Sequence, residues 1–315
     1  MGAVTLLVCA GACATLAQPA LPSSVAYSLP RTLKVQVGRG GSSRVVAVPI
    51  EDYVAATVLS EVDPPDADPK VLERMFEVQA VLTRTYAISH RGRHAQQGFD
   101  ICSSTHCQLY EPDRLRGSKW SALARQAASR TAGQILWFGH GPARAVYHAD
   151  CGGHTSAATE VWQGDALSYL PSAVDGGPAK AAHTSWTFEA SPEDLREALN
   201  ADSRTSVGSD VKSIDIDETD SAGRVERATL RGARTVDVRG DVLRDVLSRA
   251  FGVRSIRSTL FTVTRTKDTF VFSGRGFGHG VGLCQAGAMA RLQAGQAPLT
   301  VLAHYFPGTA LSLAR

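Results

Sequence analysis

The sequence predicts an α+β fold in which small mixed sheets are combined with helices. Segments with the alternating pattern of strands and segments with a helical repeat follow one another in the first half of the chain. Between about residues 180 and 265 a further group of strands and helices appears, which we interpret as an inserted α+β subdomain. The glycine-rich stretch 274–288 then changes from an extended or loop pattern to a helical one.

The first predicted elements are two strands within residues 32–50, joined by a glycine-rich turn. A helix over 51–62 follows, because Val54, Val58 and Val62 recur at helical spacing before Asp63-Pro-Pro ends the pattern.

Asp68 and Pro69 supply an N-cap and a first-turn proline for a second helix, which runs to about His90. Gln79 and Arg84 lie in an apolar context on this helix. We therefore expect them in a buried polar network or against a ligand, whereas exposure to solvent is accepted for Thr83.

A loop over 91–118, a helix over 118–130 and a hairpin of 135–138 with 143–148 complete the first half. The inserted block is predicted as strands at 185–188, 211–216, 225–230, 234–238 and 260–264, with helices at 192–199 and 240–250. A strand over 269–273 then enters the glycine-rich stretch.

Glycine occupies every second position from Gly274 to Gly282. If this segment is extended, one face is bare and allows close approach of another chain or a flat ligand. The opposite face carries Arg275 and His279, so the stretch is a candidate wall of a site. The alternative is a tightly packed strand without a binding role. The stretch matches neither a phosphate loop nor a dinucleotide fingerprint.

The composition describes a globular protein of 315 residues with a net charge of +3. This charge is too small to indicate nucleic acid binding, and it suits an anionic polymer or a cell-envelope surface. Residues 3–17 are apolar and small, as in a secretory leader, and too short to span a bilayer. We expect a signal peptide within residues 1–25, export to the periplasm or cell envelope, and peripheral membrane contact at most. An unstructured apolar N-terminus is the alternative.

Glu61 is the candidate general acid. It falls in the last turn of the 51–62 helix, where the helix dipole disfavours an anion, among apolar residues and beside Asp63. All three effects raise the pKa of a carboxyl group, which known general acids need. An exposed glutamate without a role is the alternative. No second carboxylate stands out, which argues against an ordinary glycosidase with two carboxylates.

Cys102, His106 and Cys107 lie in one loop and are a plausible zinc-ligand set, with His94 or His90 as the fourth ligand. A disulfide between the two cysteines is the second interpretation, and a cysteine nucleophile with a histidine base is the third. Farther along the chain, Cys151 and Cys284 are candidates for a disulfide in an oxidising compartment.

Six segments in this order resemble one family. They are Leu59-Ser-Glu-Val62, 78–87 (VQAVLTRTYA), 99–108 (FDICSSTHCQ), 147–155 (YHADCGGHT), 274–288 (GRGFGHGVGLCQAGA) and His304-Tyr-Phe-Pro-Gly308. Together they resemble the SpoIID/LytB family, the stage II sporulation protein D type of lytic transglycosylase. The resemblance covers residues 30–315, which we expect to form one SpoIID-like unit containing the insertion.

The resemblance implies cleavage of the β-1,4 bond between N-acetylmuramic acid and N-acetylglucosamine in peptidoglycan strands stripped of stem peptides. The family's catalytic glutamate matches Glu61, and the substrate's own C6 hydroxyl acts as the nucleophile, so a single carboxyl suffices. A sugar groove is then expected, and its contacts would be Gln79, Arg84, Tyr86, Gln108, Tyr147, His148, Arg275, His279 and Gln285.

Some members of the family bind zinc in the segment that matches Cys102, His106 and Cys107, and His94 is our choice for the fourth ligand. We expect a structural zinc ion and no organic cofactor. In place of Cys151 and Cys284 the sporulation proteins frequently have serine.

Two other functions stay open at this point. The LytB side of the family suggests a non-catalytic peptidoglycan-binding protein that stimulates a cell-wall amidase. The cysteines also allow a cysteine and histidine hydrolase that uses Cys107 or Cys284.

Overall fold

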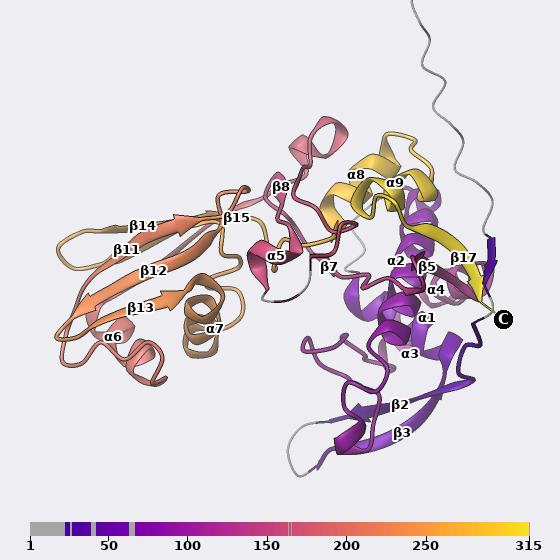
Figure 1. Cartoon of the computed structure of the whole chain (residues 1–315), viewed down its shortest axis with the longest axis horizontal. Helices are drawn as coiled ribbons and strands as arrows, with labels where there is room; N and C mark the ends of the chain where they lie inside the picture. The colour runs from indigo at the N-terminus through magenta and orange to yellow at the C-terminus, as the bar shows by residue number, and fades with distance from the viewer. Residues whose placement is uncertain are drawn as a thin grey trace, which may run out of the picture.

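The computed structural model describes residues 23–25, 27–38, 42–62, 67–162, 164 and 166–314. It confirms the α+β class, with helices set against several small sheets (Figure 1). Two hydrophobic clusters divide the buried residues: one lies within the first 170 residues and the C-terminal helices, the other within residues 186–272. We call these parts the body and the lobe.

Helices form most of the body. The long helix α2 lies against its neighbours, and it is buried on nearly all sides because they surround it (Figure 1). Its N-cap is Asp68, whose side chain accepts the N–H of Lys70 at 2.7 Å, as the sequence predicted. Thr83 is fully buried, which corrects the expectation that it faces solvent. The helices of the body are α1 (Ile50–Glu61), α2 (Pro69–Ser89), α3 (Arg114–Gly117), α4 (Ser121–Arg130), α8 (Gln285–Gln293) and α9 (Pro298–Tyr305).

Two sheets flank these helices. In one, β2 (Thr32–Val37) pairs antiparallel with β3 (Arg44–Pro49) and parallel with β4 (Ile101–Cys102). This pairing fixes Cys102 at the edge of the sheet, beyond the short 3-10 helix η2 (Ala95–Gln97). The other sheet has the order β1 (Ser23–Val25), β17 (Ala310–Ala314), β5 (Gln134–Phe138) and β6 (Gly141–Pro142).

The lobe contains two three-stranded antiparallel sheets and two covering helices, and it extends to one side of the body (Figure 1). Every strand and helix predicted for residues 185–273 is present, with ends that differ by a few residues. The lobe consists of β10 (Ser185–Ala190), α6 (Pro192–Asn200), β11 (Val211–Thr219), β12 (Val225–Gly232), β13 (Thr235–Arg239), α7 (Gly240–Phe251), β14 (Phe261–Arg265) and β15 (Phe270–Arg275). Phe270 and Phe272 belong to its core, so the cluster extends beyond residue 265. The division into leader, catalytic unit and insertion remains a prediction.

The connection between body and lobe differs from the predicted hairpin. The second strand of the predicted hairpin was expected at 143–148. In the structure the end of this segment is β7 (Tyr147–His148), which pairs in parallel with β16 (Leu283–Cys284). This pairing brings the glycine-rich stretch beside Tyr147. The remaining short elements of the connection are β8 (His154–Thr155), α5 (Ala158–Val161), β9 (Ala173–Val174) and η3 (Gly177–Ala181).

Residues 276–282 of the glycine-rich stretch form a loop between β15 and β16, which is the second of the two patterns, extended or loop, that the sequence left open. Gly276, Gly278, Gly280 and Gly282 all have positive φ, a conformation that favours glycine. A Cβ atom at Gly278 would lie 2.7 Å from the Cβ of His148. The glycine positions, which have no side chain, therefore pack against a neighbouring segment of the same chain.

None of the helices in the described part of the chain has the length and apolar character to cross a membrane. Of the expected signal peptide, residues 1–25, the structure describes only β1. Asp63, whose charge was expected to act on Glu61, lies outside the described residues.

Candidate functional site

Glu61 is the last residue of α1, and the next residue, Val62, is buried in the core of the body. Its side chain is partly exposed, whereas the preceding residues from Tyr53 to Ser60 are buried. The carboxylate oxygen Oε1 accepts the backbone N–H of Leu109 at 2.5 Å, and the hydroxyl of Tyr147 also interacts with the carboxyl group. Two distant segments thus hold this carboxyl in place.

Burial raises the pKa of Glu61 to about 7 from its usual 4.5. The hydrogen bonds from Leu109 and Tyr147 oppose this shift because they stabilise the anion, and the nearby charge of Glu111 adds to it. The sequence predicted the direction of the shift from the apolar surroundings. Near neutral pH this carboxyl group exchanges a proton readily, as a general acid and base must.

A chain of polar side chains leads to Glu61. The hydroxyl of Tyr53 donates to Oε1 of Gln108 at 2.9 Å, and Nε2 of Gln108 donates to the hydroxyl of Tyr147 at 3.0 Å. Burial raises the pKa of both tyrosines well above their usual range, so both remain phenols. This chain orients the Tyr147 hydroxyl toward the Glu61 carboxyl. Tyr53 was not among the predicted site residues, because a buried tyrosine within an apolar helix has the pattern of a core residue.

Gln285 joins the glycine-rich stretch to the same site. Its Nε2 donates to the backbone oxygen of Glu61 at 3.3 Å and to Oε1 of Gln79 at 3.1 Å. Gln79 and Gln108 are fully buried, so neither faces a substrate directly; for Gln79 this is the buried polar network that the sequence gave as one alternative. They position Gln285 and Tyr147, which are partly exposed.

His148 and His279 lie next to each other beside the site, with ring centroids 5.3 Å apart. His148 is buried and its Nδ1 lies 3.1 Å from the carbonyl of Val281, so it supports the loop. His279 is partly exposed, contacts Trp162 and lies 3.0 Å from the carbonyl oxygen of Tyr147. Burial lowers the pKa of both rings, that of His279 to about 3, so both are neutral.

The four predicted metal ligands converge. The ligand atoms of His94, Cys102, His106 and Cys107 all lie within 4.8 Å of one another. The sulfurs of Cys102 and Cys107 are 3.0 Å apart and unbonded. Nε2 of His94 lies 3.2 Å from the sulfur of Cys107. Nδ1 of His94 is held by Gln97, which leaves Nε2 free to act as a ligand.

This donor set of two thiols and two imidazoles fits a tetrahedral structural zinc ion. The cluster lies next to the Glu61 site, because Gln108 and Leu109 directly follow Cys107. Tyr86, a predicted substrate contact, lies near both cysteines of this cluster and near Tyr147. It is buried and stacks on His90 at a centroid distance of 3.9 Å, and burial raises its pKa to about 12.

The family model of stage II sporulation protein, SpoIID, matches residues 38–138. The stage II sporulation protein D of Bacillus subtilis (strain 168) is 25% identical over 293 residues, covering 89% of this chain and 79% of the relative. Residues 38–138 of the chain therefore form a SpoIID family domain. A second model, a domain of unknown function (DUF8618), matches residues 179–282, which include the lobe.

Two further relatives extend the comparison. The amidase enhancer of Bacillus subtilis (strain 168) is 26% identical over 285 residues, covering 75% of this chain. The chain spans only 38% of that relative's length. An uncharacterized protein of Brachyspira hyodysenteriae (strain ATCC 49526 / WA1) is 29% identical over 272 residues, covering 82% of the chain and 65% of the relative.

The SpoIID match contains Glu61 and the cysteine–histidine cluster, whereas Tyr147 and Gln285 come from later parts of the chain. The site is therefore completed by β7 and by the N-terminus of α8. The parallel pairing of β7 with β16 places these two elements side by side.

Arg84 is not a substrate contact. Its guanidinium is fully buried, with Nε 3.0 Å and Nη2 2.5 Å from the carboxylate of Glu51, and it also donates to backbone carbonyls of Ala128 and Gln134. Its role is to join α1, α2 and α4, which agrees with the buried network foreseen as an alternative. Arg275 is exposed at the end of β15, opposite Ser185 of β10, and so belongs to a sheet of the lobe.

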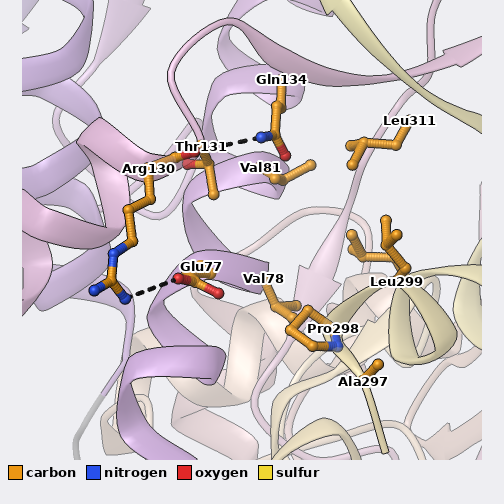
Figure 2. A pocket seen from close by; sticks show the side chains of 11 residues that line it. Glu77, Val78, Val81, Arg130, Thr131, Gln134, Ala297, Pro298, Leu299 and Leu311 are labelled. Carbon is orange, nitrogen blue, oxygen red and sulfur yellow. Dashed lines mark hydrogen bonds and ion pairs between the residues drawn. The ribbon is translucent and has the colours of Figure 1, made fainter. Parts of the chain in front are cut away.

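Two cavities adjoin the body. One, of about 560 Å³, is lined by Ser103, Ser104, Leu109, Tyr110 and Glu111 together with Gln36 and Gly38, and so borders the loop that holds Glu61. The other, of about 330 Å³, is mainly apolar and lies between α2, the start of α9 and β17 (Figure 2). It contains none of the predicted site residues.

Proposed function

We propose that this protein is a peptidoglycan lytic transglycosylase that acts in the cell envelope. Its substrate would be denuded glycan, and the bond cleaved would be the β-1,4 bond from N-acetylmuramic acid to N-acetylglucosamine. The observation that carries the proposal is the Glu61 carboxyl, which is partly exposed and has its pKa raised to about 7 by burial. The cell-wall setting is supported by the relatives, one of which is named an amidase enhancer.

In the first step, protonated Glu61 gives its proton to the glycosidic oxygen, and the bond from this oxygen to the anomeric carbon breaks. The C6 hydroxyl of the same N-acetylmuramic acid residue forms the new bond to that carbon. Its proton then passes to the Glu61 carboxylate. The product is a 1,6-anhydro sugar, no water is consumed, and Glu61 returns to its starting state.

The surroundings of Glu61 suit this cycle because both protonation states must be accessible. Burial favours the neutral acid that starts the reaction. The N–H of Leu109 and the hydroxyl of Tyr147 stabilise the carboxylate that exists between the two proton transfers. In this proposal Tyr147 and Gln285, held by their buried partners, border the sugar, with His279 nearby.

Zinc, when bound by His94, Cys102, His106 and Cys107, would supply rigidity rather than chemistry. These residues would fix the loop that contains Gln108 and Leu109. In this loop Leu109 donates its N–H to Glu61, and Gln108 donates its Nε2–H to the hydroxyl of Tyr147. We therefore propose a structural role for this cluster. The proposal needs no organic cofactor.

Glu111 offers a matched control. It is exposed, forms an ion pair with Arg114 at 2.6 Å and lies near enough to Glu61 to affect its pKa. A hydrolase with two carboxylates would need a second acid of this kind. On denuded glycan we expect Glu61→Gln to abolish the appearance of anhydro ends and Glu111→Gln to retain it. Full activity in Glu61→Gln would refute the assignment.

The second candidate is a non-catalytic protein that binds peptidoglycan and stimulates a cell-wall amidase. The relative named amidase enhancer favours it, although this chain spans 38% of that protein. In this case wild-type protein would bind denuded glycan without releasing products, and it would increase amidase turnover equally with Glu61→Gln.

A further inference from the structure

A second group of possible metal ligands lies apart from the Glu61 site and from the cysteine–histidine loop. The ligand atoms of Asp150, Cys151, His183 and Cys284 all lie within 4.8 Å of one another. Asp150, Cys151 and Cys284 are buried and His183 is partly buried. The proposed catalytic cycle uses none of them.

Backbone amides point at both sulfurs. The N–H of Cys151 donates to Sγ of Cys284 at 3.2 Å, and the N–H of Gly287 donates to the same sulfur at 3.3 Å. The N–H of Gly153 donates to Sγ of Cys151 at 3.3 Å. Hydrogen bonds of this kind stabilise thiolates, and the N-terminus of α8 adds its dipole at Cys284. The two sulfurs are unbonded, and each accepts at least one backbone N–H.

The orientation of His183 adds an independent argument. Its Nε2 lies 3.3 Å from the carbonyl oxygen of Asp175, which can only accept, so Nε2 carries hydrogen. Its Nδ1 faces Oδ1 of Asp150 at 2.8 Å and Sγ of Cys151 at 3.8 Å. A neutral ring would thus turn a lone pair toward a carboxylate. This arrangement needs a cation between the groups, either a proton on Nδ1 or a metal ion.

Further contacts hold the carboxylate of Asp150 toward the cluster. Its Oδ1 accepts the N–H of Gly152 at 2.8 Å, and its Oδ2 accepts the N–H and the hydroxyl of Thr184 at 2.8 and 2.9 Å. The thiol of Cys151 donates to the adjoining carboxylate of Asp175 at 3.5 Å, and this carboxylate is already ion-paired with Arg291 at 2.8 Å. The cluster therefore has one carboxylate left to serve as a ligand.

We propose that Asp150, Cys151, His183 and Cys284 form a second metal site, which binds Zn²⁺ or a similar thiophilic divalent cation. Two thiolates, one imidazole and one carboxylate make the four donors of a closed zinc site. The donor atoms come from three distant segments, and the backbone amides and the carbonyl of Asp175 already fix their orientation.

The location indicates what the metal does. Asp150 and Cys151 follow β7, His183 precedes β10, and Cys284 is the N-cap of α8, so the cluster lies where the lobe joins the body (Figure 1). Arg224 from the lobe donates to the carbonyl of Cys151 at 2.6 Å at the same place. The metal ion thus ties the lobe to the body and supports the strand that carries the Tyr147 side chain.

The test is the metal content and the Co²⁺ spectrum of the full chain, purified with zinc and without chelator. The loop variant Cys102→Ser/Cys107→Ser removes the other cluster. We expect it to retain one zinc ion per chain and to give a thiolate-to-cobalt charge-transfer band with Co²⁺. Absence of both signals from a folded loop variant would overturn the proposal.

Three further variants separate the alternatives. Cys151→Ser/Cys284→Ser should bind one zinc ion fewer than wild type. His183→Gln, which keeps all thiols, should also lose one ion, whereas the control His154→Gln should lose none. If the double cysteine variant does not fold, the two histidine variants decide the matter. Unchanged metal content in His183→Gln, or a Cys151–Cys284 disulfide in the protein as isolated, would overturn the proposal.

Discussion

The Glu61→Gln variant should be more stable than the wild type at pH 8, although it loses activity. Burial raises the pKa of Glu61 from 4.5 to about 7, so the folded protein holds this proton more tightly than the unfolded chain does. The stability from this group is fully present below pH 4.5 and is lost as the pH rises to 7. Each tenfold change in proton affinity is worth about 1.36 kcal/mol, so ionised Glu61 destabilises the folded state by up to about 3 kcal/mol.

A neutral glutamine of similar shape removes this cost and can still accept the N–H of Leu109. Urea unfolding of the two proteins at pH 4.5 and pH 8 measures the effect. We expect nearly equal free energies of unfolding at pH 4.5 and a gain approaching 3 kcal/mol for the variant at pH 8. Glu111→Gln, at an exposed ion-paired position, should change stability by less than about 1 kcal/mol at either pH. A Glu61→Gln effect independent of pH would refute the pKa argument.

Four further predictions concern activity, packing and metal binding. The kcat/KM for denuded glycan should fall about tenfold per pH unit above pH 7, because the protonated acid starts the reaction. The variant Tyr147→Phe removes an interaction that lowers the pKa of Glu61. In pH–rate profiles the kcat/KM of this variant should therefore begin to fall at a higher pH than that of the wild type. Arg84→Met leaves Glu51 without its partner and should cost about 3 kcal/mol in urea unfolding, with no change in the pH profile. Removing zinc with a chelator should lower the Tm, and added Zn²⁺ should restore it.

The sequence predicted local structure well where the signals were local. The N-cap at Asp68 and the order of strands and helices in the lobe follow from neighbouring residues. The pairing of β7 with β16 joins segments more than a hundred residues apart, and no periodicity in either segment indicates the partner. The same limit left the glycine-rich stretch open between an extended and a loop conformation, since its positive φ angles depend on close packing against His148 and Asp150.

In the candidate site, too, the sequence predicted features with local signals and missed those that depend on long-range contacts. Glu61 was selected as the candidate acid from its position at a helix end among apolar residues and from the family motif. Whether a polar side chain faces substrate or protein depends on tertiary packing, and so Gln79 and Arg84 proved to be buried. Tyr53 was missed for the converse reason, because its hydrogen bond to Gln108 links residues 55 positions apart. The sequence identified the chemical groups but could not say which of them are buried and which are partly exposed at the site.

The most direct test of the central claim is the fate of solvent oxygen during cleavage. Denuded glycan would be digested by the wild-type protein in water labelled with heavy oxygen, and the new ends would be analysed by mass spectrometry. We predict 1,6-anhydro ends without the label, formed by the wild type and by Glu111→Gln and absent with Glu61→Gln. Reducing ends that carry heavy oxygen would show hydrolysis and contradict the single-carboxyl mechanism.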